Sequence, residues 1–90
     1  MKNSMDIAKM IVKKYSTFAM KDTVLEYNKS GEPQKTEKQY RVMLVDCLGY
    51  SMSANSKIKS QAEQEIARVI CNDIDNGVLV LSKDWEQDNL

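Results

Sequence analysis

The side chains that most often perform acid–base chemistry or bind metal ions are scarce in this sequence. It contains no histidine, the residue most often used as a general base near neutral pH and a frequent zinc ligand. Its two cysteines, Cys47 and Cys71, stand 24 residues apart and belong to no ligand-spaced cluster. The carboxylates are scattered without pairing, and no glycine-rich phosphate loop is present. The sequence therefore predicts a protein that is not an enzyme and that holds no metal ion or other cofactor.

Lysines at the start of the second predicted helix could bind phosphate groups. Lys57 and Lys59 lie where that helix begins, and the partial positive charge of a helix N-terminus would add to theirs. Lys9 and Lys13 lie on the polar side of the first predicted helix and could extend such a surface. The same positions also suit ordinary solvated lysines, and the sequence leaves both interpretations open.

Charge is distributed unevenly along the chain, although 13 Lys and Arg balance 13 Asp and Glu overall. Residues 1–41 hold nine basic and five acidic side chains, whereas residues 63–90 hold two basic and seven acidic ones. The acidic C-terminal part could therefore complement a basic surface of a protein partner. Its candidate contact residues are Asp73, Asp75, Asp84, Trp85 and Glu86. Trp85 could instead close over the core, which is the commoner role of a tryptophan.

Length and composition predict a single domain over residues 1–90, with an acidic tail over about 83–90 that frays beyond Trp85. Of the 90 residues, 42% are hydrophobic and 29% are charged, as in globular proteins. The longest apolar runs, 42–45 and 78–81, have four residues, whereas a membrane-spanning helix needs about 20. No apolar export signal is recognisable near the N-terminus. These features predict a cytoplasmic protein without membrane contact, whose thiols stay reduced.

Hydrophobic spacing predicts two helices, over residues 4–19 and 57–75. The apolar stripe of the first consists of Ala8, Ile11, Val12, Tyr15, Phe18 and Ala19. The stripe of the second consists of Ile58, Ala62, Ile66, Val69, Ile70 and Ile74. The candidate N-caps are Ser4 for the first helix, and Ser56 or the capping box Ser60-x-x-Glu63 for the second. Asn76-Gly77 should end the second helix, because glycine adopts the left-handed conformation that closes helices.

Between the helices, β-branched and aromatic residues predict strands over 23–28, 39–45 and 50–54. A polar loop that contains the single proline is predicted over 29–38, and a type I turn over 46–49. Residues 78–81 could form a short fourth strand or pack on the core as an apolar clasp. The predicted fold class is α+β, with a three-stranded antiparallel sheet whose strands lie between the two helices in sequence. The second helix is predicted to pack on one face of the sheet.

Four short motifs accompany this order of elements. They are Glu26-Tyr27, Ser30-Gly-Glu-Pro-Gln34, the strand Tyr40-Arg-Val-Met-Leu-Val, and the helix start Lys57-x-Lys59-x-x-Ala62-Glu-Gln64. Together with the order of elements over about residues 4–76, they resemble the double-stranded-RNA-binding domain. The resemblance implies that duplex RNA is bound through its shape and its phosphates. The positions that it implies for these contacts are Lys9, Lys13, Gln34, Lys35, Lys57 and Lys59.

The sequence thus leaves two binding functions open. The first is binding of duplex RNA, as the resemblance implies. The second is that of a small accessory or inhibitor protein, of the type that phages or mobile elements encode, which docks on a protein partner through its acidic C-terminal part. Under either function, residues 78–81 could also pair two copies of the chain along a sheet edge.

Overall fold

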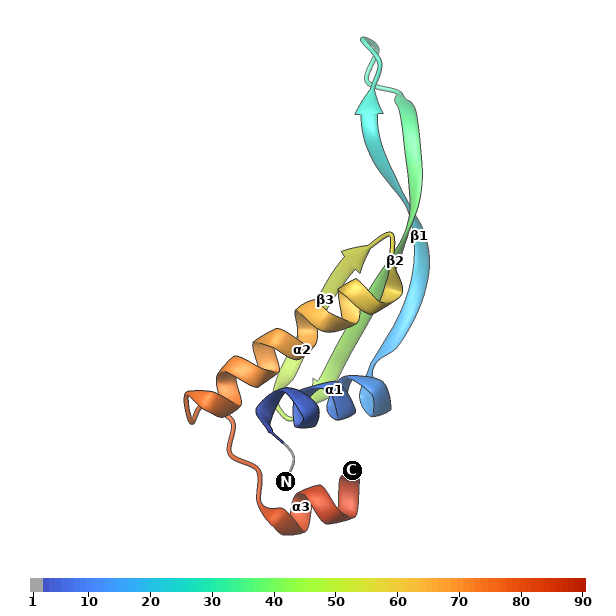
Figure 1. Cartoon of the computed structure of the whole chain (residues 1–90). Helices are drawn as coiled ribbons and strands as arrows, with labels where there is room; N and C mark the ends of the chain where they lie inside the picture. The colour runs from blue at the N-terminus through green and yellow to red at the C-terminus, as the bar shows by residue number, and fades with distance from the viewer. Residues whose placement is uncertain (1–2) are drawn as a thin grey trace.

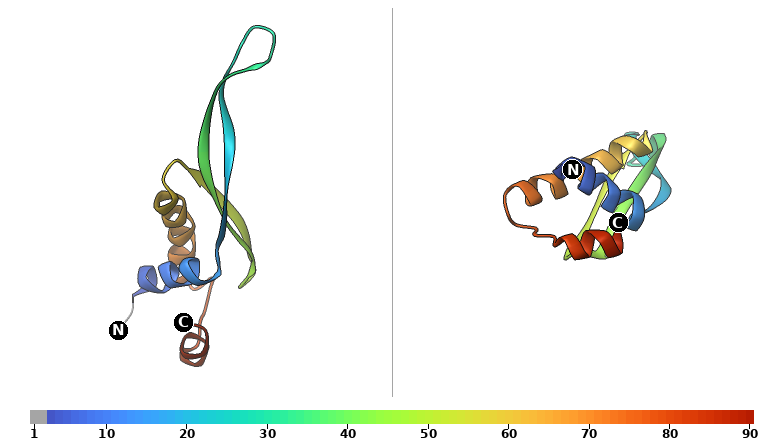
Figure 2. Two further views of the ribbon diagram at one scale, coloured as in Figure 1. Left: turned by 90° about the vertical axis from the view of Figure 1, so that its right-hand side faces the viewer. Right: turned by 60° about the horizontal axis from the view of Figure 1, so that its bottom comes forward.

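The computed structural model describes residues 3–90, which form helices and a three-stranded antiparallel sheet (Figure 1). The elements are α1 (Ser4–Tyr15), β1 (Thr17–Tyr27), β2 (Pro33–Cys47), β3 (Tyr50–Ser56), α2 (Lys59–Asp75) and α3 (Lys83–Asn89). α1 and α2 lie on the same side of the sheet (Figure 2). This arrangement confirms the predicted α+β fold and adds α3, which was not predicted. Among the described residues, no helix is both long and apolar enough to cross a membrane.

The hydrophobic core lies between these two helices and the broad part of the sheet. Within residues 3–90, the buried side chains are all apolar. They are Ala8, Ile11 and Val12 of α1, Val42 and Leu44 of β2, and Ala62, Ile66, Ala67 and Ile70 of α2. Since burial of one large aliphatic side chain contributes about 1.5–3 kcal/mol, α1, α2 and β2 supply most of the stability. β1 contributes no buried residue.

The hairpin of β1 and β2 extends far beyond this core. β3 pairs with β2 only from Tyr40 to Cys47, whereas β1 pairs with β2 from Met43 out to Pro33. Beyond Tyr40 the hairpin is therefore a two-stranded ribbon that projects away from the helices (Figure 1). It makes the molecule 56 Å long but only 22 Å across. We call residues 21–39 the arm.

Opposite charges face each other across the arm. The register places Asp22 opposite Lys38 and Glu26 opposite Lys35. Cross-strand pairs of this kind stabilise an antiparallel ladder by about 0.2–1 kcal/mol each. The arm is therefore ordered by its own ladder and its own charge pairs, not by the core.

The polar loop predicted over 29–38 is wrong, because most of this segment belongs to β2, which begins at Pro33. The turn is short because the Oδ1 atom of Asn28 accepts hydrogen bonds from the backbone N–H groups of Ser30 and Glu32, at 3.0 and 2.9 Å. Proline is tolerated as the first residue of a strand, where its missing N–H does not interrupt the ladder. The polar composition indicated a loop, but pairing with β1 satisfies the backbone and keeps these residues extended.

α1 is shorter than predicted and runs from Ser4 to Tyr15, not to Ala19. Its N-cap is Asn3 instead of Ser4, and the Asn3 side chain accepts a hydrogen bond from a first-turn N–H. Phe18 and Ala19 belong to β1 and pair with β2. Helical spacing of apolar residues is compatible with a strand over so short a segment, and the ladder with β2 decides the conformation.

α2 begins at Lys59, with Ile58 in the N-cap position. Since Ile58 has no side-chain acceptor, the first turn is not capped, and the predicted capping box of Ser60 and Glu63 does not form. The Ser56 hydroxyl instead accepts a hydrogen bond from the N–H of Ile58, just before the helix. The predicted caps of α2 are therefore wrong, although its place in the chain is close to that expected.

The turn between β2 and β3 differs from the type I turn predicted over 46–49. Leu48 and Gly49 form a two-residue loop with φ values of 53° and 82°. Two successive positive φ values are typical of a type I′ turn, whose twist matches that of the flanking strands. Asp46, with φ of 52°, lies at the neighbouring shift in strand register.

The residues that follow α2 form no fourth strand within the described chain. α2 ends at Asn76-Gly77 as predicted, with Gly77 at a φ of 73°. In the segment 78–81, Leu79 and Leu81 pack against the core. This arrangement agrees with the clasp and not with the strand, so the segment presents no strand edge of its own.

Candidate interaction surface

No group of three or more potential metal ligands comes together among residues 3–90. Cys47 and Cys71 are both free and half-buried. Burial raises the pKa of the Cys47 thiol, and burial followed by the Asp75 carboxylate raises the pKa of Cys71. Because the thiolate is the reactive form, both cysteines are held in their less reactive state near neutral pH.

The lysines at the start of α2 are engaged by neighbouring side chains. Lys57 forms a salt bridge with Glu37 of β2. The Nζ atom of Lys59 lies 4.1 Å from the centre of the Phe18 ring, and the centroid of that ring is 5.9 Å from the centroid of Tyr40. Both cations therefore lie where the arm joins the helices, and the charge of Lys57 is compensated.

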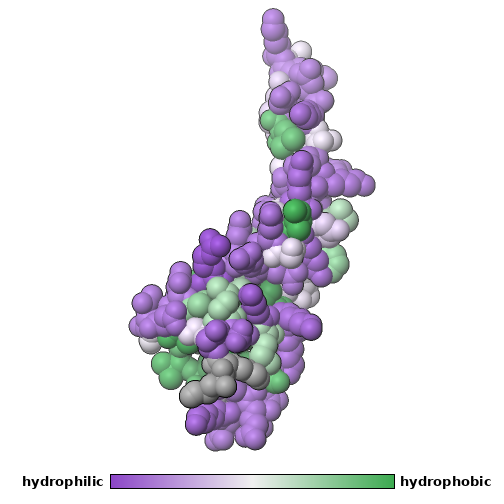
Figure 3. Space-filling view, viewed as in Figure 1, coloured by the Kyte–Doolittle hydropathy of each residue, from purple (hydrophilic) through white to green (hydrophobic). Residues whose placement is uncertain are grey.

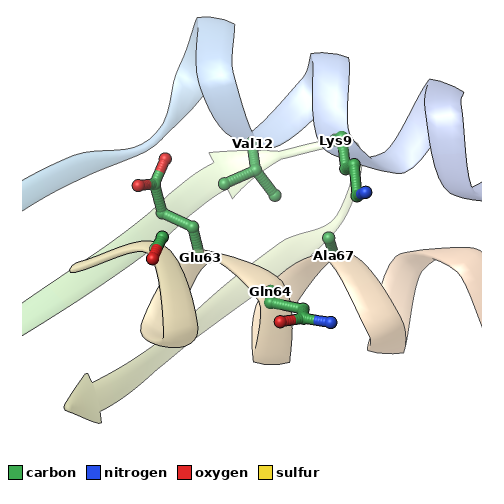
Figure 4. A pocket seen from close by; sticks show the side chains of 6 residues that line it. Lys9, Val12, Glu63, Gln64 and Ala67 are labelled. Carbon is green, nitrogen blue, oxygen red and sulfur yellow. The ribbon is translucent and has the colours of Figure 1, made fainter. Parts of the chain in front are cut away.

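A groove of about 320 Å³ runs between α1 and α2 (Figure 4). Lys9 and Val12 line it from α1, and Glu63, Gln64 and Ala67 line it from α2. The groove thus carries a carboxylate as well as a cation, which reduces its attraction for a phosphate. Lys9 lies here, away from the arm.

The remaining predicted RNA contacts lie elsewhere. Lys13 is exposed on α1, whereas Gln34 and Lys35 lie near the far end of the arm, at the start of β2. At about 3.4 Å per residue, Lys35 lies about 17 Å along β2 from Tyr40, where the sheet becomes three-stranded. The six positions are therefore divided among the groove, α1, the start of α2 and the far part of the arm.

The acidic residues at the end of α2 have partners within the fold. Asp73 accepts a hydrogen bond from the Tyr50 hydroxyl at 2.5 Å, and Asp75 accepts one from the Ser4 hydroxyl. Ser4 is the first residue of α1, so Asp75 lies beside the positive end of that helix dipole. This contact explains a carboxylate that would be unfavourable at the C-terminus of its own helix.

Replacing Tyr50 by phenylalanine should lower the free energy of unfolding by about 1 kcal/mol, the usual value of one hydrogen bond.

The same substitution should also make the free energy of unfolding less sensitive to alkaline pH. Burial, followed by the hydrogen bond to Asp73 and the charge of Asp73, raises the pKa of Tyr50 from 10.0 to about 12. The folded protein therefore holds this proton more tightly, and the stability present below pH 10 is lost as the pH rises towards 12. Urea unfolding at a series of pH values should show a steeper alkaline loss for the wild type, and equal slopes would contradict this assignment.

α3 closes the end of the molecule opposite the arm (Figure 1). The Ser82 hydroxyl caps it by accepting a hydrogen bond from the N–H of Trp85 at 3.1 Å. The Tyr15 hydroxyl donates to the backbone oxygen of Asn89 at 3.3 Å, and Trp85 and Leu90 pack against the core. Trp85 thus takes the core-closing role, and the fraying expected beyond it is wrong.

Replacing Trp85 by alanine should release α3 while α1, α2 and the sheet stay folded. Trp85 is half-buried, so the expected loss is about 2 kcal/mol, half of that for a fully buried tryptophan. Amide exchange should accelerate over residues 83–90 and stay unchanged in the middle of α2. Asp84→Ala provides the control, because Asp84 lies next to Trp85 on the same helix and is exposed. Glu86, the other neighbour of Trp85, is half-buried and is therefore less suitable. Unchanged exchange in α3 of the Trp85 variant would show that Trp85 does not hold it.

Several exposed apolar side chains along the hairpin were not predicted from the sequence. Phe18 and Met20 are 51% and 53% exposed, and Leu25 and Tyr27 are 46% and 63% exposed. Figure 3 shows isolated hydrophobic residues among hydrophilic ones along this part of the molecule. The available signal was the two-residue spacing of Phe18 and Met20, and again of Leu25 and Tyr27, which is the period of a strand.

No family model, curated protein or solved structure matches this chain. The resemblance to the double-stranded-RNA-binding domain therefore remains a prediction from short sequence motifs. The function has to be inferred from the arm, from its exposed side chains and from the charges around its base.

Proposed function

We propose that this protein is a non-catalytic protein-binding module, an accessory or inhibitor protein that contacts its partner through the arm. The observation that supports this function is that residues 21–39 project from the core and contribute no residue to it. A small domain gains stability by burying its residues, and a two-stranded ribbon alone is only marginally stable in water. A long ribbon that is nevertheless ordered suits contact with another molecule.

The charge of the arm favours a protein partner over a nucleic acid. Residues 21–39 hold four lysines and four carboxylates, whereas affinity for nucleic acid depends on cations that neutralise phosphates. At the base of the arm, Lys57 is already paired with a carboxylate. The arm offers Leu25 and Tyr27 as exposed apolar side chains, and tyrosine is enriched in protein interfaces.

The acidic C-terminal part has less to offer a partner than its composition indicated. Asp73 and Asp75 are hydrogen-bonded to Tyr50 and Ser4, and Trp85 packs against the core. These residues hold the fold together, so we assign the contact with the partner to the arm.

Crosslinking inside cells of the source organism tests this function. A photoreactive phenylalanine analogue replaces Tyr27 near the tip of the arm, and in a matched control it replaces Val69, which is 45% exposed on α2. We expect the Tyr27 position to yield one discrete protein adduct and the Val69 position to yield none. A gel shift with duplex RNA at low and physiological salt should show no specific complex.

Four results would overturn the proposal. Nuclease-sensitive adducts at Tyr27 would favour an RNA partner, as would a salt-dependent gel shift. Equal adducts at Tyr27 and Val69 would show that the arm has no special role. The absence of any adduct at Tyr27 would remove the arm as the contact surface.

A further inference from the structure

We infer that the outer edge of β1 accepts an extended, acidic segment of the partner protein as an additional strand of the sheet. This inference rests on the proposed function and specifies how the partner is held. β1 is an edge strand that pairs with β2 on one side, and among residues 3–90 no other strand lies beside it. α2 reaches β1 through the Lys59 side chain, which lies over the Phe18 ring. The backbone N–H and C=O groups on its outer side are therefore available to another strand.

The two edges of the sheet are protected to different degrees. β3 has seven residues, and its exposed positions are all polar. β1 has eleven residues, and the first four, 17–20, carry no charge. Charges begin at Lys21, and the register becomes irregular only after Val24. Since exposed edge strands are usually short, charged or bulged, the segment 17–20 has the character of an edge that is covered in a complex.

Two exposed apolar side chains of this segment would be buried against the side chains of an added strand. Phe18 and Met20 lie opposite Val42 and Tyr40 in register, and both are about half exposed, at 51% and 53%. Alternate residues of a strand lie on the same face of a sheet. An added strand would therefore place every second side chain next to Phe18 and Met20, where apolar residues are favoured.

The charges around this edge give the partner strand its acidic character. Lys21 is in β1 itself, Arg41 lies opposite Ala19, and the Lys59 ammonium lies over the Phe18 ring. Asp22 follows Lys21 in β1 but lies opposite Lys38, and the first turn of α2, which begins at Lys59, contains no acidic residue. A segment with Asp or Glu between its apolar residues complements these cations.

A second copy of the chain fits the edge less well. Two copies of β1 that pair about a two-fold axis must centre on one residue, which then faces its own copy. Centring on Lys21 or Asp22 places like charges directly opposite each other, which is destabilising. Centring on Met20 places Lys21 opposite Ala19 and Asp22 opposite Phe18, so neither charge gains a partner, and centring closer to Thr17 leaves at most five residues of β1 paired.

Selection from a random peptide library displayed on phage, with the full chain as bait, tests this inference. We expect enriched peptides with apolar residues at alternate positions and Asp or Glu between them. A synthetic copy of an enriched peptide should slow amide exchange in residues 17–22 by about tenfold or more, since added ladder hydrogen bonds protect backbone amides. The exchange of β3, the opposite edge, should not change.

A matched pair of variants tests the role of charge. Lys59→Glu should weaken binding of the enriched peptide by about fivefold, because it places a carboxylate beside the acidic strand. Lys83→Glu makes the same charge change at an exposed site on α3, and it should leave the affinity unchanged. Equal effects of the two variants would show that Lys59 does not contribute to recognition.

Other outcomes would overturn the inference. Enriched peptides whose apolar residues have helical spacing would place the contact elsewhere, as would slower amide exchange in the groove between α1 and α2. If the library yields no enriched peptide, the β1 edge does not bind an extended segment. Self-association that protects residues 17–22 would identify a second copy as the occupant. If Tyr27 crosslinks to a protein while the amides of residues 17–22 stay unprotected in that complex, strand addition is wrong although the proposed function stands.

Discussion

Replacing Leu44 by alanine is expected to lower the free energy of unfolding by about 3 kcal/mol. Leu44 has no exposed surface and belongs to the cluster that joins β2 to α1 and α2. The substitution removes apolar burial and leaves a cavity that the surrounding helices fill only in part. A domain of this length has a total stability of about 5–13 kcal/mol, so this single change removes a large share. Urea unfolding followed by circular dichroism measures the loss.

Val45→Ala is the matched control for this prediction. Val45 is the next residue of β2, on the opposite face of the sheet, and it is 62% exposed. Both changes shorten an aliphatic side chain in the same strand, but the Val45 variant should lose no more than about 0.5 kcal/mol. Similar losses in the two variants would show that the core does not lie on the helix-covered face.

The parts of the fold that depend on local periodicity could be predicted from the sequence. Ala8, Ile11 and Val12 were expected on the apolar stripe of the first helix, and all three are buried. The second helix was placed correctly, and Ala62, Ile66 and Ile70 of its predicted stripe are buried. Val69 was expected inside and is 45% exposed, whereas Ala67 was not expected there and is buried. The stripe is rotated because α2 packs against α1 as well as the sheet, and a small residue lines the groove between the two helices.

The arm could not be predicted, because non-local pairing creates it. Its ladder joins Thr17 to Met43, 26 positions away, and no local pattern carries that information. The spacing of Phe18 fits a helix that continues from α1, and polar residues 29–38 fit a loop equally well. The contacts that occupy predicted site residues within the fold also join residues distant in sequence. An example is the hydrogen bond that the Tyr50 hydroxyl donates to Asp73. Side-chain types were therefore a fair guide to the core and a poor guide to the interaction surface.

Shortening the arm should strongly weaken partner binding while it leaves the fold nearly as stable as before. The variant replaces residues 22–38 by Asn-Gly, the preferred sequence of a two-residue hairpin turn. The turn connects Lys21 to Gln39, its partner in register. No deleted residue belongs to the core or packs against it. The free energy of unfolding should therefore change by less than about 1 kcal/mol. Capture of the polypeptide that the Tyr27 crosslinker marks should fall by about tenfold or more, because only residues 17–21 of the β1 edge remain to pair with it.

The Leu44→Ala variant supplies the reciprocal control, because it weakens the core and keeps the whole arm. At a temperature at which it is still folded, it should capture the partner as well as the wild type does, in spite of its lower stability. Stability and binding would then separate, with the core setting the first and the arm the second. If the shortened variant unfolds at much lower urea concentration, the arm has a structural role. If it captures the partner as well as the wild type does, the arm does not contribute to binding, and the contact lies on the helices, on β3 or on residues 17–21 of β1.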